Sequence, residues 1–192
     1  MIPGGRLSTT PIPAPLVLAS PQPSARVSRH RGGINLQDSS QGLNVQTWVC
    51  ETNGTNVTLR GETVPQTTLF TGTGITEVSL AFDQNMNPFV AFVDAGGPKF
   101  RWFDPQIPGI VITSLPAGSQ TPRCCLDDGR VSQLPNGDII LAYVRAGILY
   151  YRQQRDRFLI EYQLASGLFA PLRSVAMNRA LRLQFHIGAT PP

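Results

Sequence analysis

Charged side chains are scarce in this sequence and make up only 15% of its 192 residues. A soluble domain usually has about a quarter. The net charge is +4, and of the 16 basic residues a single one, Lys99, is lysine. Apart from two short clusters the positive charge is spread along the chain, so we expect no binding of nucleic acid. A surface so poor in charge is either covered by a partner or made of uncharged polar residues, and composition leaves both open.

Cysteine and histidine are also few. The cysteines are Cys50 and the adjacent pair Cys124 and Cys125, and neighbouring cysteines bridge only through a strained ring. The histidines, His30 and His186, lie far apart, and the sequence has no CxxC spacing. We therefore expect reduced, partly buried thiols, synthesis in a cytoplasm, and no structural zinc or other cofactor.

Long apolar segments are missing as well. The sequence has no run of about 18 apolar residues, so we expect no membrane span. The first 25 residues resemble a signal peptide in composition, but Pro11, Pro13 and Pro15 interrupt their apolar part. Because the apolar region of a signal peptide is uninterrupted, we reject that interpretation.

Residue patterns that carry catalysis are likewise absent. Paired carboxylates can hydrolyse glycosides, but most aspartates here lie beside Asn, Gly or Pro, where a turn uses their side chains. A nucleophile activated by histidine would need His30 or His186, which lie in a Pro-rich region and near the end of the chain. We therefore expect no enzymatic activity. The aspartates in question are Asp83, Asp94, Asp104, Asp127, Asp128, Asp138 and Asp156.

Proline is plentiful, with 17 residues, and it is concentrated near the start of the chain. Residues 1–33 form a Pro-rich segment of low complexity, which favours extended conformations and cannot pack a core alone. We predict an extended N-terminal arm that neighbouring subunits hold in place; packing across its own domain is the alternative. The rest of the chain, 34–192, is predicted to be a single β-rich domain.

Three hairpin-like units are predicted in that domain. They lie near 34–64, 74–104 and 130–162, where short apolar runs rich in β-branched and aromatic residues alternate with turns. Asn53-Gly54, between two such runs, is a strong hairpin signal. The tail adds an alternating strand with Leu181, Leu183 and Phe185 facing inward, although an amphipathic helix over 172–183 competes with it.

Two of these units look like copies of one repeat. The segment FVAFVDAG at 89–96 overlays ILAYVRAG at 140–147, which lies 51 positions later. A unit of this size matches a propeller blade, although any two meandering hairpins look alike. We predict a mainly β fold of short antiparallel blade-like repeats, in partial propeller-like or sandwich-like sheets. Too few units are present to close a propeller, and open strand edges pair readily with other chains.

Two clusters of charge are candidate interface residues. Arginine makes planar, bidentate contacts and is common in interfaces, although a GC-rich genome enriches it through codon usage alone. Aromatic residues at strand spacing, by contrast, are expected in the core more than in a ligand site. The candidate interface residues are Arg26, Arg29, Arg31, Arg152, Arg155, Asp156 and Arg157.

Several segments resemble a group of small virion proteins of tailed bacteriophages. They carry no catalytic signature, and ILAYVRAGILYYRQQRDRFLIEY is the most distinctive of them. The resembling segments are GINLQDSSQGLNVQTW (33–48), GITEVSLAFDQNMNPFVAF (74–92), RWFD (101–104), RCCLDDGR (123–130), ILAYVRAGILYYRQQRDRFLIEY (140–162) and NRALRLQF (178–185).

This resemblance implies a structural role in the virion and no active site. We expect a non-enzymatic component of the tail or head-to-tail region, made in the host cytoplasm and assembled as a homo-oligomeric ring. Its partners would be other tail or neck proteins. The alternative is a carbohydrate- or receptor-binding module at the tail tip or fibre-attachment site, which would use exposed Trp and Tyr side chains. A glycan-hydrolysing propeller fragment is a third, weaker interpretation.

Overall fold

The structure is a computed structural model of the chain. The described residues are 26–34, 45–61, 64–83, 86–107, 109–127, 138–168, 170–177 and 182–188. The arm expected over 1–33 lies outside them up to position 25.

The described residues form four antiparallel sheets, each made from one continuous stretch of chain. Sheet A contains β1 (Arg26–Ile34), β2 (Val45–Thr52), β3 (Asn56–Gly61) and β4 (Thr67–Thr71). Sheet B contains β5 (Glu77–Phe82), β6 (Pro88–Asp94), β7 (Gly97–Phe103) and β8 (Ile110–Ser114). Sheet C contains β9 (Ser119–Asp127), β10 (Asp138–Arg145), β11 (Ile148–Gln153) and β12 (Tyr162–Ser166), with the short helix η1 (Gln154–Asp156) after β11. Sheet D contains β13 (Leu172–Met177) and β14 (Leu183–Ile187).

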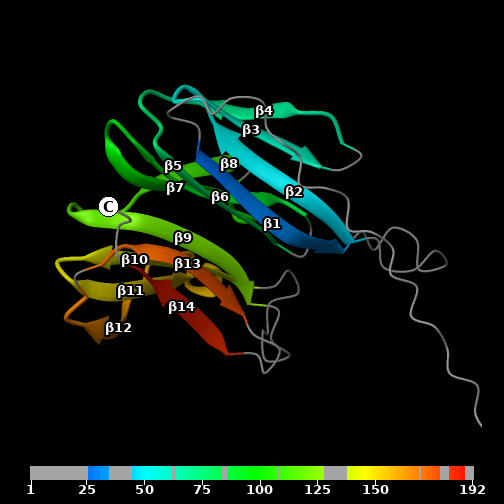
Figure 1. The fold of residues 1–192 in the computed structure, drawn as a ribbon. Helices are drawn as coiled ribbons and strands as arrows, with labels where there is room; N and C mark the ends of the chain where they lie inside the picture. The colour runs from blue at the N-terminus through cyan, green and yellow to red at the C-terminus, as the bar shows by residue number, and fades with distance from the viewer. Residues whose placement is uncertain are drawn as a thin grey trace, which may run out of the picture.

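The sheets follow one another in chain order. Sheets A and B occupy the upper half of Figure 1 and sheets C and D the lower half. The first strand of each sheet contacts the first strand of the next, so that β1 meets β5, β5 meets β9 and β9 meets β13. This arrangement is that of consecutive propeller blades around an axis, left open after the fourth sheet. The predicted fold, mainly β with blade-like repeats, is confirmed.

Three hydrophobic layers hold the sheets together. Cys50, Val57 and Leu59 of sheet A pack on Val90 and Phe92 of sheet B. The side chains of β6 that point the other way, with those of β7 and β10, form the layer between sheets B and C. A third layer joins sheets C and D. Sheets B and C each have a neighbouring sheet on both faces, which explains why β6 and β10 are apolar on both faces over their central residues, 89–93 and 139–144.

The predicted repeat corresponds to equivalent hairpins. FVAFVDAG belongs to β6 and ILAYVRAG to β10, and each strand is the second of its sheet. Across the two-residue turns, Asp94 pairs with Gly97 and Arg145 pairs with Ile148, so the spacing of 51 residues is kept through both turns. In the second hairpin Ala146 and Gly147 both have positive φ, which a tight turn of this kind requires.

The limits of the units differ from those predicted. Residues 26–33, which were assigned to the arm, pair with β2 as strand β1. The third sheet begins at β9, before the predicted start at 130, and the first part of the predicted unit, 130–137, lies outside the described residues. Pro122 argues against a strand in the sequence, so β9 was not predicted. The proline is tolerated because β9 is an edge strand of its sheet.

The competing helix over 172–183 is wrong for its first half, because residues 172–177 form β13. The alternative strand is confirmed for the residues that the structure describes. Leu183 and Phe185 of β14 are half-buried against the third hydrophobic layer, and Arg182 and Gln184 are exposed.

Candidate functional site

An arginine ties three sheets together near the axis. The Arg123 Nη1 atom of β9 lies 2.8 Å from Oε2 of Glu77 on β5, and its Nε donates to the backbone carbonyl of Arg173 on β13 at 3.0 Å. Both partners are on first strands. The planar guanidinium suits this position because its donors point in fixed, divergent directions. The contact fixes how sheets B, C and D follow one another.

A buried thiol makes the neighbouring contact between β5 and β9. The Ser79 Oγ accepts a hydrogen bond from the Cys124 backbone N–H at 3.1 Å, and the Cys124 Sγ lies 3.2 Å from the Ser79 carbonyl. Burial raises the pKa of Cys124 to about 11, and burial also raises the pKa of Cys50 to about 12. Thiols of this kind are unreactive at neutral pH. All three cysteines are free and buried, as expected, and Cys124 and Cys125 face opposite layers.

The densest polar cluster surrounds Glu161, just before β12. Its carboxylate accepts hydrogen bonds from the Tyr143 hydroxyl and from Arg145, and it pairs with Arg152. Arg152 also donates from Nε to the Tyr143 oxygen at 3.0 Å and from Nη1 to the Phe158 carbonyl at 2.9 Å. Every group in this cluster has a partner within the chain, so the cluster fixes the loop between β11 and β12 against sheet C.

The pKa values in this cluster reflect those contacts. Burial would raise the pKa of Glu161, but hydrogen bonds from Tyr143 and Arg145 outweigh it and hold the pKa below its ordinary value. Burial, with the hydrogen bond to Glu161, raises the pKa of Tyr143. A carboxylate that stays ionised beside a phenol that stays protonated offers no proton exchange near neutral pH.

A second ion pair joins sheets B and C at the rim. The buried carboxylate of Asp104, after β7, accepts from Arg157 and from the backbone N–H of Gln106. Burial would raise the pKa of Asp104, but the hydrogen bond from Arg157, the backbone hydrogen bond from Gln106 and the charge of Arg157 together outweigh it, and the pKa is lowered. The loop after β7 therefore lies against the loop after β11.

The candidate interface residues fall in two places. Arg152, Arg155, Asp156 and Arg157 lie at the end of β11 and in or beside η1. They bind within the chain: Arg155 pairs with Asp127 at 3.9 Å and Asp156 accepts from the Tyr162 hydroxyl at 2.8 Å. Two of the partners, Asp127 of Arg155 and Asp104 of Arg157, come from distant parts of the chain and have no local sequence signal.

The other candidates, Arg26, Arg29 and Arg31, lie on β1 in sheet A, away from η1 in sheet C. The structure therefore does not bring the two clusters into one sheet. Contact of either cluster with a partner stays a prediction.

Other aspartates have the turn role that the sequence predicted. Asp83 accepts from the Asn87 backbone N–H at 2.8 Å, and Asp94 accepts from that of Gly96 at 2.8 Å. Within the described part of the chain, no group of three or more His, Cys, Asp or Glu side chains is placed to hold a metal ion. None of the helices in that part is long and apolar enough to cross a membrane.

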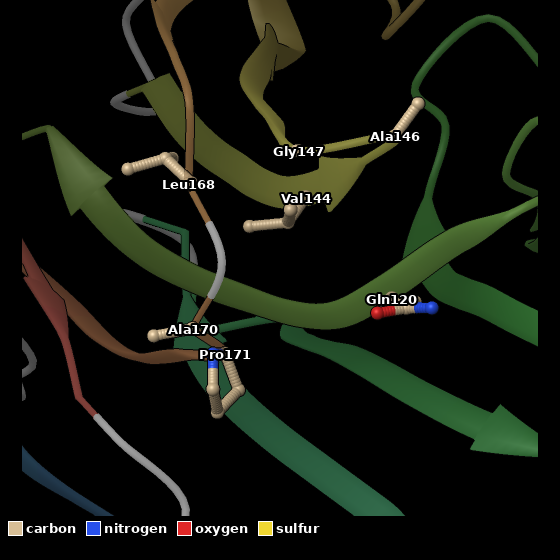
Figure 2. Close-up of a pocket in the computed structure, with 7 residues that line it drawn as sticks. All are labelled: Gln120, Val144, Ala146, Gly147, Leu168, Ala170 and Pro171. Atoms are coloured by element: carbon tan, nitrogen blue, oxygen red, sulfur yellow. The ribbon is translucent and has the colours of Figure 1, made fainter.

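A cavity of about 420 Å³ opens between sheets C and D. Figure 2 shows that its walls come from the start of β9, the turn between β10 and β11, and the segment before β13. Gln120 is the one side chain in the lining with hydrogen-bonding groups, and none of the lining residues titrates. The lining residues carry no charged side chain, so the cavity offers no ion pair to a ligand. The lining residues are Gln120, Val144, Ala146, Gly147, Leu168, Ala170 and Pro171.

Exposed apolar side chains gather on the outer strands and on the loops that lead to them. Leu159 is 77% exposed, and Ile110 and Ile112 of β8 are 55% and 52% exposed. The Asp104–Arg157 pair brings the end of β7, where Phe103 lies, beside the loop containing Leu159. We call Phe103, Ile107, Ile110, Ile112, Leu159 and Ile160 the rim patch. The sequence did not predict the rim patch. Whether the isoleucines of β8 are buried depends on whether a neighbouring sheet covers that strand, and the sequence of β8 alone does not show this.

Most aromatic side chains lie in the layers. Trp102 is buried and meets Phe158 edge-on at 5.0 Å, and Trp48 packs on Phe82 at 5.2 Å. Phe103 is the one aromatic side chain in the described residues that is classed as exposed. The expectation of core packing for these residues is confirmed.

No family model, no curated protein and no solved structure matches this chain. A function can therefore be inferred only from the geometry of the chain itself and from its sequence.

Proposed function

We propose that this chain is a non-enzymatic structural component of a tailed-phage virion, in the tail or head-to-tail region, where it mediates subunit assembly. The observation that carries the proposal is the open outer edge of the fourth sheet. Sheet D has two described strands where sheets A, B and C have four, and no described strand pairs with the far edge of β14. An unpaired strand edge is a template for a strand of another chain.

Sheet D is held in a fixed position by its contacts with sheet C, so its free edge is available for such pairing. Leu172 and Val175 are buried in the layer against sheet C, and the Leu172 backbone N–H donates to the Thr121 hydroxyl at 3.2 Å. The sheet is thus anchored on one face and open at one edge. If the strand that completes it comes from the next copy of the chain, the contact is head-to-tail and repeats by rotation into a ring.

The state of the carboxylates supports a structural role. Glu161, Asp104 and Asp94 each bind a cation of the same chain, and the pKa values of Glu161 and Asp104 lie below their ordinary values. A general acid needs the opposite shift, toward neutral pH. These acidic groups are therefore suited to fixing loops.

The proposal is tested in the phage that encodes the chain. Purified particles should contain the protein by mass spectrometry, and disruption of its gene should give particles that lack a tail or a neck part. A variant with Gln184→Asp and His186→Asp places charge on exposed positions of β14 and should fail to enter the particle. The control, Ser174→Asp, places a negative charge on an exposed position of β13, the strand that lies next to β9 and away from the open edge, and should enter. Normal particles without the protein would overturn the proposal.

The alternative function, a carbohydrate- or receptor-binding module at the tail tip or fibre-attachment site, needs exposed aromatic rings. Neither tryptophan supplies one, because Trp102 is buried and Trp48 is packed on Phe82. A glycan array separates the two functions, since an assembly component should bind none of its sugars. Binding that is lost on Phe103→Ala would favour the alternative.

A further inference from the structure

Strand β8 is the outer edge of sheet B. It consists of Ile110, Val111, Ile112, Thr113 and Ser114, without charge or proline. Alternate residues are exposed, and Ile110 and Ile112 are among them. Monomeric proteins usually protect such an edge with a charged residue, a proline or a bulge. Strand β8 has none of these.

The other outer edges are less regular. The ladders of β3 with β4, β11 with β12 and β13 with β14 each contain a register shift. The ladder of β7 with β8 has none and runs from the pair Phe103–Ile110 to the pair Lys99–Ser114. A regular edge keeps its outward N–H and C=O groups in the even spacing that another strand needs. Among the described outer edges, β8 is the one best suited to pairing.

We infer that β8 pairs antiparallel with β8 of a second copy of this chain about a two-fold axis, with Ile112 opposite itself. Sheet B of each copy then continues into sheet B of the other. The contact is self-complementary, because the same surface serves both copies. It goes beyond the proposed function, since it needs neither a particle nor a second protein.

The side chains of β8 suit a copy of themselves. Two-fold pairing at Ile112 places Ile110 opposite Ser114 and Val111 opposite Thr113, so no like charges meet and no charge is buried. Ile112 opposite Ile112 brings two β-branched side chains into direct contact, and such side chains suit the pleated surface of an antiparallel sheet. Phe103, beside Ile110 in the ladder, extends the apolar surface at each end of the contact.

Cross-linking tests the register. In Ile112→Cys the two introduced thiols face each other with Cβ atoms about 5 Å apart, so oxidation should give a covalent dimer. In Ile110→Cys, the matched control, the two thiols are displaced by about 13 Å along the strands and should not bridge. The double variant Ile110→Cys with Ser114→Cys should bridge again. The native cysteines are buried, so they do not compete.

The oligomeric state tests the contact itself. Analytical ultracentrifugation of the unmodified chain should show a concentration-dependent dimer, and Ile112→Lys should be monomeric while its circular dichroism stays native. Leu164→Lys, on the exposed part of the irregular outer strand β12, should dimerise as the unmodified chain does. A monomer at every concentration, or equal dimerisation of Ile112→Lys, would overturn the inference. So would cross-linking of Ile110→Cys as efficient as that of Ile112→Cys. Failure of the particle test with a retained dimer would count against the proposed function alone.

Discussion

Arg101 and Arg152 occupy the same position in consecutive sheets. Arg101 pairs with Val90 across the β6–β7 ladder, and Arg152 pairs with Leu141 across the β10–β11 ladder. Their surroundings differ. Arg152 has three hydrogen-bond acceptors, whereas Arg101 is 7% exposed and lies over the ring of Phe70 at 5.7 Å. The Arg101 side chain has no hydrogen bond or ion pair to another described residue, and its burial lowers its pKa.

This difference predicts opposite effects of one substitution. Arg101→Met removes a buried cation that has no anionic partner among the described residues, and it should raise the free energy of unfolding by about 1 kcal/mol or more. Arg152→Met leaves the Tyr143 and Phe158 oxygens without a donor, and it should lower that free energy by about 1–3 kcal/mol. Urea unfolding measures both. If both variants lowered the free energy of unfolding, the Arg101 side chain would have to make a contact that stabilises the fold about as much as those of Arg152.

The Tyr143 hydroxyl should also contribute measurably. Tyr143→Phe removes the group that joins Glu161 to Arg152, and it should lower the free energy of unfolding by about 1–2 kcal/mol. Phe92, the residue equivalent to Tyr143 in sheet B, supplies the matched test. Phe92→Tyr places a hydroxyl near Arg101, as in sheet C. In a double-mutant cycle with Arg101→Met, this hydroxyl and Arg101 should show a favourable coupling of about 1 kcal/mol; zero coupling would contradict the equivalence.

Acid should destabilise the fold through Glu161 and Asp104. Both have a folded pKa below the unfolded value of about 4. Their contribution is complete above that unfolded value and is lost as the pH falls through the folded one. The melting temperature should therefore fall below about pH 4, and Glu161→Gln should reduce the slope of that fall. An equal slope for the variant would mean that Glu161 is not the group that titrates.

Arg123 should control the attachment of sheet D. Arg123→Ala removes its contacts with Glu77 and with the Arg173 carbonyl, so amide exchange should accelerate in β13 and β14 more than in sheets A and B. Hydrogen-exchange mass spectrometry measures this difference. Lys99→Ala, which breaks an ion pair within one hairpin, is the control and should leave β13 and β14 protected. Uniform acceleration in the Arg123→Ala variant would mean that Arg123 stabilises the whole chain.

The central hairpins were predictable because local pattern and burial agree. β6 and β10 are apolar on both faces and end in turns with glycine, so the spacing of 51 residues is visible in the sequence itself. β13 was ambiguous for a physical reason. A register shift between Leu172 and Ser174 puts Leu172 and Val175 on one face, and a spacing of three is also that of a helix.

The polar contacts and the rim patch were beyond prediction. Arg157 and Asp104 are 53 residues apart in sequence, and nothing local marks them as a pair. Ile110 and Ile112 look like core residues in a strand, and they are exposed only because the neighbouring sheet does not cover β8. These features depend on how the sheets pack against one another. The pattern of apolar residues within one strand gives no information about that packing.

The order of the first strands has a consequence for how the chain reaches its structure. Since β1, β5, β9 and β13 contact each other in sequence, the stability of the stack is close to a sum of sheet terms and nearest-neighbour interface terms. Each sheet can form as soon as its own stretch leaves the ribosome, on the surface of the one before it. Sheet D, the fourth along the chain and described with two strands, is then where fraying starts, and a strand added there by a partner would cap the array.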